Sequence, residues 1–140
     1  MTRRVIHTDR APARPGFSQA VVAGNLLFVS GTVGMDMMTG AWPSGIEAQG
    51  EQALNNLEAV LIAAGCSFDD VVKVTMFVTD VSDAAKIAGA YSRAFPAPPP
   101  ARSTPVVSGF PMPEALISIE AVALIPPVAG GPRTFDPTNQ

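Results

Sequence analysis

Cysteine and histidine are the scarcest chemistry-bearing residues in this sequence, with one of each among 140 residues, Cys66 and His7. A single cysteine excludes an internal disulfide and a cysteine-based zinc site, and it follows an apolar helical run in which a buried thiol is the simpler interpretation. One histidine in an amino-terminal strand offers neither a metal-ligand set nor a Ser-His-Asp arrangement. We therefore expect no metal site, and cytoplasmic residence is the default.

Charge is also scarce, since Asp, Glu, Lys and Arg together make up only 15% of the chain. The 9 basic and 12 acidic residues leave a net charge of -3 and no basic cluster, so nucleic acid is not an expected partner. Hydrophobic residues reach 47%, and so low a charge is unusual for a monomer that must cover its whole surface with polar groups. The composition therefore favours an oligomer.

Long apolar runs are missing as well. The amino terminus, MTRRVIHTDRAPARPG, has basic residues but no apolar core of a signal peptide, and no window approaches the length of a membrane span. The glycines of GTVGMD are not followed by Gly-Lys-Ser/Thr, and no dinucleotide fingerprint opens a helix. We expect a soluble, unprocessed protein with no membrane partner, in which these glycines form turns.

The first half of the chain predicts a strand, a hairpin and a long helix. Residues 3–8 are strand-like, and Gly24-Asn25 separates two β-rich runs, which is a hairpin signal. Between Ile46 and Ala64 apolar residues recur at spacings of three and four, the pattern of an amphipathic helix. Gly65 supplies the end of that helix.

The second half predicts a long strand, a second helix and two more strands. Residues 71–79 alternate with period two, and Asp80 or Ser82 can cap a helix that runs to about Phe95. Tyr91 lies on the apolar face of this helix, which places it in the core with its hydroxyl at an edge. The further strands span Ser103–Ser108 and Ala115–Ile125.

This order of elements predicts an α+β layer in which two helices cover one face of a mostly antiparallel mixed sheet. We expect residues 1–127 to form a single domain and a Pro/Gly-rich tail, residues 128–140, to leave the core. The strand at 71–79 is apolar on both faces, although the helices can cover only one. We expect the second face of the sheet to meet a partner surface.

Arg102 has an unusual setting, between the prolines of PAPPPA and the start of a strand. The prolines restrict the backbone that carries it, so the guanidinium is mounted on rigid chain. Its planar group can donate two parallel hydrogen bonds to a carboxylate. The alternative is an arginine in an ordinary surface ion pair, and the residues alone leave both open.

Five ordered blocks resemble the Rid family of reactive imine and enamine deaminases, also called YjgF-like or L-PSP proteins. The resemblance covers roughly residues 15–125, and its PARS block is among the most recognisable pieces. The blocks read PGFSQAVVAGNLLFVSG, EQALNNLEAVLIAAGCSFDDVVKVTMFVTD, AYSRAF, PPARSTPVV and ISIEAVAL.

The resemblance implies a chorismate-mutase-like α+β fold and a homotrimer packed around a central β-barrel, with an active-site cleft at each subunit interface. By this resemblance Arg102 grips the carboxylate of a 2-imino or 2-enamino acid. Water then attacks the C=N carbon and ammonia leaves, which gives a 2-keto acid without a cofactor. The backbone at Ser30, Gly31 and Thr104 is expected to line the same cleft.

Several positions depart from the family pattern. Phe17 stands where the family has tyrosine, Ala88 where asparagine is common, and Thr104 where cysteine is usual. The family's EIE reads SIE, so Ser118 replaces the first carboxylate, the usual candidate for activating water. The changes at 17, 88 and 118 all remove polar groups, which indicates a substrate with a larger or more apolar side chain.

Glu120 remains two residues beyond Ser118, on the same face of the strand. It can take over water activation, or it can be a structural group at the barrel axis. A serine is no base by itself near neutral pH, so a chain that depends on Ser118 is expected to be a slow deaminase or to use a different substrate.

The sequence is compatible with two functions of different classes, an enzyme and a binding module. The first is an imine or enamine deaminase with Arg102 and Glu120 as catalytic residues and Phe17, Ser30, Gly31, Ala88, Thr104 and Ser118 as substrate-binding residues. The second is a binding or regulatory module on the same trimeric fold, in which Arg102 holds a small 2-keto acid without turnover. A ribonuclease is disfavoured by the acidic charge balance.

Overall fold

One mixed sheet of six strands, in the order β1-β2-β3-β6-β4-β5, forms the centre of the computed structural model, which describes residues 3–127. Neighbouring strands are antiparallel except for β4 and β5. The expected tail at residues 128–140 lies outside the described residues. The strands are β1 (Arg4–Ile6), β2 (Ala20–Ala23), β3 (Leu26–Val33), β4 (Val71–Val78), β5 (Ala101–Ser103) and β6 (Ile117–Leu124).

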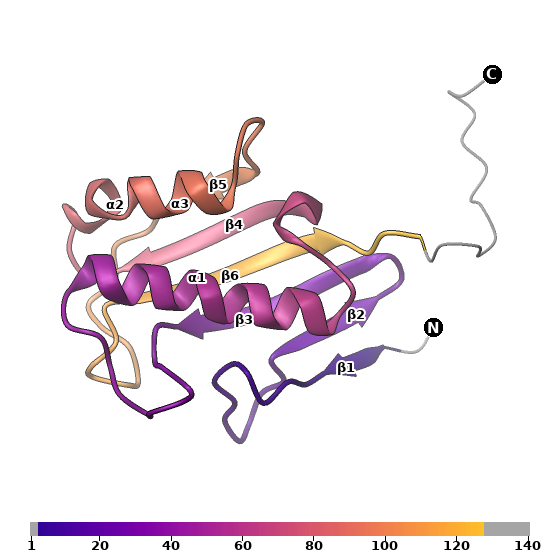
Figure 1. The fold of residues 1–140 in the computed structure, drawn as a ribbon, viewed down its shortest axis with the longest axis horizontal. Helices are drawn as coiled ribbons and strands as arrows, with labels where there is room; N and C mark the ends of the chain where they lie inside the picture. The colour runs from indigo at the N-terminus through magenta and orange to yellow at the C-terminus, as the bar shows by residue number, and fades with distance from the viewer. Residues whose placement is uncertain (1–2, 128–140) are drawn as a thin grey trace.

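The helices are α1 (Ile46–Ala63), α2 (Asp83–Lys86) and α3 (Ala88–Ala94), with a short 3-10 turn at Phe68–Asp70. Figure 1 shows them on one side of the sheet, with α1 across its middle and α2 and α3 along the edge formed by β4 and β5. This arrangement confirms the mixed α+β fold. Among residues 3–127 none of the helices combines the length and apolar character needed to cross a membrane.

The long helix α1 forms where the apolar spacing predicts it. Ala53, Leu57 and Leu61 are completely buried against the sheet, because residues three and four apart share one face of a helix. The helix ends at Ala64, and Gly65 has a φ of 79°, a left-handed conformation that glycine adopts without steric cost. The predicted helix is therefore confirmed.

The second helix is divided, so the expectation of two helices is wrong. The backbone of Ile87 leaves helical geometry with φ -100° and ψ 3°, and it separates α2 from α3. Ile87 is buried against Gly50 of α1, where an added Cβ would lie 2.7 Å from Ile87 Cγ2. Tertiary packing at this close approach accounts for the break, which the apolar pattern of the second helix does not reveal.

The strand after the prolines also differs from the prediction. It occupies Ala101–Ser103 instead of Ser103–Ser108, and beyond it only Val106 forms an isolated bridge, to Val78. Pro105 has no N–H to donate, so a regular ladder cannot continue through it. The Pro105 carbonyl instead accepts from the Val78 N–H at 3.2 Å.

The register aligns residues into rows that cross the sheet. On the helix side the buried row consists of Ile6, Ala20, Val29, Ala121 and Val74, which pair in succession across five strands. Residues directly opposite one another share a face of the sheet. All five are buried, so this row forms the floor of the hydrophobic core.

The opposite side of the sheet, which we call the bare face, has no helix over it (Figure 1). Its central row, the bare row, pairs Val5, Val21, Phe28, Val122, Lys73 and Ala101 in succession. Val5 is 54% exposed and Phe28 46%. Four large apolar side chains therefore cross a face that no element within residues 3–127 covers.

Asn56 is the polar residue that fastens α1 to the end of β3. It is 2% exposed, and its side-chain amide donates to the carbonyls of Val33 at 2.8 Å and Met35 at 2.9 Å. These bonds satisfy one carbonyl at the last residue of β3 and one just beyond it, which would otherwise lack partners.

Replacement of Asn56 by alanine is expected to lower the free energy of unfolding by about 2 to 4 kcal/mol, because it removes two buried hydrogen bonds and leaves both carbonyls unpaired. Urea denaturation followed by circular dichroism measures the change. Asn55→Ala is the matched control, since Asn55 is exposed at the next position of the same helix, and it is expected to change stability by less than about 0.5 kcal/mol. Equal losses in the two variants would contradict this role of Asn56.

Candidate functional site

Arg102 lies at the end of the buried row, where β5 forms the edge of the sheet. It pairs with Val74, so its side chain is on the helix side. Arg102 is thus the residue that follows the five apolar residues of the buried row. The guanidinium carbon lies 4.5 Å from the centroid of the Tyr91 ring on α3, which is cation–π distance. Arg102 is exposed, and within residues 3–127 no carboxylate forms an ion pair with it.

An open groove of about 640 Å³ extends from Arg102. Ala88 and Tyr91 line it from α3, and Phe95 with Pro96, Pro99 and Pro100 supplies apolar walls. The groove therefore combines one exposed cation with a mostly apolar lining, as small-molecule sites commonly do. Of the residues predicted for the site, it brings together Arg102 and Ala88.

Glu120 and Ser118 lie on the bare face, on the other side of the sheet from Arg102. Glu120 pairs with Thr75, which in turn pairs with Ser103. None of these three residues belongs to the buried row on the helix side. Glu120 is half-buried and lines a shallow depression of about 180 Å³ together with Phe28, Lys73 and Thr75.

Ser30 and Gly31 form a β-bulge opposite Glu120. Val29 pairs with Ala121 and Thr32 with Ile119, so two residues of β3 stand against one residue of β6, which is the definition of a bulge. The Ser30 hydroxyl donates to the Ser18 carbonyl at 2.6 Å.

Gly31 makes a close contact across the strands. A Cβ at this position would lie 2.6 Å from Ser118 Oγ, closer than atoms of this kind approach one another. Gly31 and Ser118 are therefore in direct contact, and the backbone at Gly31 stays open because it has no side chain.

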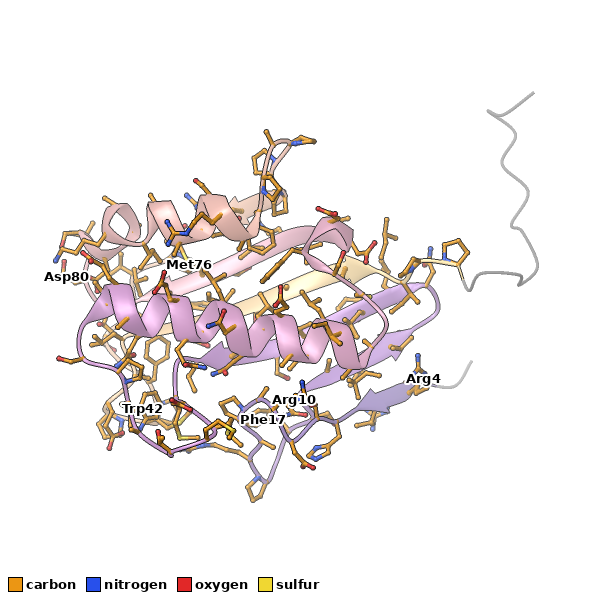
Figure 2. The ribbon with its side chains drawn as sticks, in the orientation of Figure 1. Arg4, Arg10, Phe17, Trp42, Met76 and Asp80 are labelled. Carbon is orange, nitrogen blue, oxygen red and sulfur yellow. The ribbon has the colours of Figure 1, made fainter. Side chains whose placement is uncertain are left out.

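Phe17 lies on the loop before β2, near the opposite edge of the sheet (Figure 2). It is 49% exposed and borders a groove of about 430 Å³ that Val5, His7 and Arg14 also line. β1 and β5 are the two edges of the six-stranded sheet. Five strand spacings separate them, which is roughly 24 Å, so Phe17 and Arg102 do not share a pocket within one chain. Thr104 directly follows β5 and is half-buried.

One chain thus presents the predicted residues as three separate groups. Arg102 and Ala88 border a groove on the helix side; Ser30, Gly31, Ser118 and Glu120 meet on or beside the bare face; Phe17 lies at the far edge. Among the described residues no group of three or more His, Cys, Asp or Glu side chains gathers as metal ligands do.

Tyr91 is a residue of the site that the sequence places only in the core. It is buried, as predicted, but its ring supports the Arg102 guanidinium, and its hydroxyl is enclosed instead of lying at an edge. Burial raises the pKa of the Tyr91 hydroxyl, and Arg102 opposes this rise through its nearby charge and through the approach of its side chain to the hydroxyl. The signal that could have revealed it is its position three residues after Ala88, one turn along the helix.

Comparisons with known proteins agree with this fold. The model of the Endoribonuclease L-PSP family matches residues 8–125. Reactive Intermediate Deaminase A, chloroplastic, of Arabidopsis thaliana is 41% identical over 125 residues, which cover 88% of this chain and 66% of that protein. The 2-iminobutanoate/2-iminopropanoate deaminase of Rattus norvegicus is 40% identical over 124 residues, with 87% and 90% covered.

A solved structure shows the same likeness. The crystal structure of E. coli TdcF with bound serine superposes with a TM-score of 0.81 at 35% identity, over 86% of this chain and 98% of that one. The mixed sheet with its helices on one side is the fold of this class of protein. The chain belongs to the L-PSP family, which is the Rid family that its sequence blocks resemble.

The contact between Gly31 and Ser118 generates a prediction. Gly31→Ala is expected to destabilise the protein by about 1 to 3 kcal/mol, because the new methyl group overlaps Ser118 Oγ. In a Ser118→Ala background the same change is expected to cost less than about 0.5 kcal/mol, since the two β carbons would lie 4.0 Å apart. Thermal unfolding of the four proteins of this cycle measures the coupling. Purely additive effects would show that the two residues do not touch.

Proposed function

We propose that the protein is a deaminase that hydrolyses small 2-imino or 2-enamino acids to 2-keto acids and ammonia. The observation that carries this proposal is Arg102, an exposed guanidinium without an ion-pair partner among residues 3–127, held over Tyr91 at the head of a mostly apolar groove. The relatives named as deaminases of 2-iminobutanoate and 2-iminopropanoate support it.

The groove suits the chemistry of this reaction. Arg102 binds the substrate carboxylate through two parallel hydrogen bonds, and this fixes the orientation of the adjacent imine carbon. The side chain of the substrate then lies along Phe95 and the prolines. Water adds to the C=N bond, with its oxygen on carbon and one proton on nitrogen. The second proton of the water then passes from the new hydroxyl to the nitrogen, and the C–N bond breaks as the C=O bond forms and ammonia leaves. Because an imine carbon is already electrophilic, positioning beside a water molecule supplies most of the acceleration.

The apolar lining favours a substrate with an apolar side chain. Ala88 contributes only a methyl group to the groove, so no polar side chain at this position contacts a ligand. By the resemblance, Phe17 also removes a hydroxyl from the site, on a wall that a neighbouring copy would supply. A substrate with a larger apolar side chain than a methyl group fits such a lining.

Water activation requires a second group, and Glu120 and Ser118 lie on the other face of the sheet from Arg102. We therefore propose a homotrimer in which the bare faces pack around a central barrel, and in which a cleft between two copies joins Arg102 of one copy with the bulge residues Ser30 and Gly31 of the next. Burial of Val5, Val21, Phe28 and Val122 would favour this association, since apolar area removed from water is stabilising.

A non-catalytic carboxylate-binding module is the second candidate. It is favoured by Ser118, which stands where family members have a carboxylate, because a serine alone is a poor base. The E. coli relative is described with bound serine, a small amino acid. The family description names an endoribonuclease, but the net charge of -3 provides no field that attracts a phosphate backbone.

Replacement of Arg102 by alanine is expected to lower kcat/KM for 2-iminobutyrate about 100-fold, because the carboxylate loses two charge-assisted hydrogen bonds. An amino acid oxidase generates the imine in place, and competition with semicarbazide measures its hydrolysis. Arg93→Ala is the matched control, since Arg93 forms an exposed ion pair with Glu51 on the helices and is expected to leave the rate unchanged.

Two results would overturn the proposed reaction. If the unmodified protein releases keto acid no faster than buffer while it still binds 2-oxobutyrate through Arg102, the binding module replaces the enzyme. If Arg102→Ala and Arg93→Ala retain equal activity, the carboxylate site lies elsewhere.

A further inference from the structure

The Tyr91 hydroxyl is a buried polar group without a well-formed hydrogen bond to any of residues 3–127. Tyr91 is 7% exposed, and the Arg102 side chain comes near its oxygen without reaching hydrogen-bond geometry. Buried polar side-chain atoms in native proteins nearly always have a hydrogen-bond partner. A phenylalanine would fill the same space without a buried hydroxyl, as Phe95 does beside it at a ring distance of 4.8 Å. The hydroxyl is therefore a group that packing does not require.

The hydroxyl belongs to the ring that supports Arg102. The guanidinium carbon lies 4.5 Å from the centre of that ring, and both residues line the groove of about 640 Å³. Tyr91 and Arg102 are thus two donors on one wall, one neutral and one cationic. A cation and a hydroxyl donor side by side form a site for an anion with two acceptor oxygens.

We propose that Tyr91 is a second hydrogen-bond donor to the carboxylate that Arg102 binds, an inference that rests on the proposed function of the groove. An anion that enters the groove draws the guanidinium toward itself, which uncovers the hydroxyl beneath it. One carboxylate oxygen then accepts from the guanidinium and the other from Tyr91 as well as from Arg102.

The protonation of Tyr91 agrees with this role. Burial raises the pKa of the hydroxyl, so it remains a neutral donor near neutral pH. A phenolate at this position would pair with Arg102 itself and compete with an incoming anion. A hydroxyl that stays protonated leaves the cation available.

Two adjacent donors also select the class of ligand. A carboxylate offers acceptors to both, whereas the corresponding primary amide offers one oxygen and an NH₂ group that is itself a donor. The pair therefore favours a 2-keto or 2-imino acid over its amide. Without the hydroxyl, the difference in affinity between the acid and its amide is expected to become smaller.

The test is Tyr91→Phe, with 2-oxobutyrate and 2-oxobutanamide as probes in isothermal titration calorimetry. We expect the Kd of 2-oxobutyrate to rise about tenfold and the Kd of the amide to stay within about twofold, since a charge-assisted hydrogen bond is lost only for the acid. The melting temperature of the free protein is expected to stay the same or rise, because an unpaired buried hydroxyl is removed. Ser108→Ala is the matched control, since it removes an exposed hydroxyl outside the groove and is expected to leave both Kd values unchanged.

Each other outcome overturns the inference. If Tyr91→Phe binds 2-oxobutyrate as tightly as the unmodified protein while Arg102→Ala does not bind it, the carboxylate site at Arg102 is supported and the role of Tyr91 is wrong. If the acid and the amide bind more weakly to an equal extent, or if Ser108→Ala weakens binding of the acid as much, the effect is not the loss of a hydrogen bond from Tyr91 to the carboxylate. If the unmodified protein does not bind 2-oxobutyrate, the carboxylate site and this inference fall together.

Discussion

The parallel pairing of β5 with β4 is the interaction on which the candidate site depends. Val74 stands opposite Arg102, and this register places the guanidinium on the helix side, over Tyr91. A shift of one residue would turn Arg102 to the bare face and leave the groove without its cation. The hydrogen bonds of Val78 with Pro105 and Val107 continue the contact beyond the short strand. The three-residue strand is thus held in register from its carboxyl-terminal side.

The division of the sheet into two unlike faces explains why one copy presents only part of a site. The row of apolar residues on the helix side is buried, and the cation lies at the end of that row. The other face carries an apolar row, a bulge and Glu120. Because the sheet itself separates Arg102 from Ser118 and Glu120, a cleft that contains all of them needs a second copy. The same association would cover the apolar row, so stability and function would depend on one contact.

The elements set by local pattern could be predicted from the sequence, and those set by packing could not. The α1 helix and the hairpin at Gly24-Asn25 follow from apolar period and turn chemistry. The break at Ile87 depends on the absence of a side chain at Gly50, which is distant in the chain. The contact of Arg102 with Tyr91 likewise depends on how α3 lies over β5. The resemblance to the family predicted the family and a carboxylate-binding role for Arg102. It did not predict which face of the sheet each site residue occupies.

We propose that Arg102 of one copy and the bulge residues Ser30 and Gly31 of another form one carboxylate site. A crystal structure of the protein soaked with 2-oxobutyrate tests it most directly. We expect the carboxylate on the Arg102 guanidinium of one copy, with Gly31 and Ser118 of a second copy in contact with the ligand. A ligand bound away from Arg102, or a site walled entirely by one chain, would contradict the account.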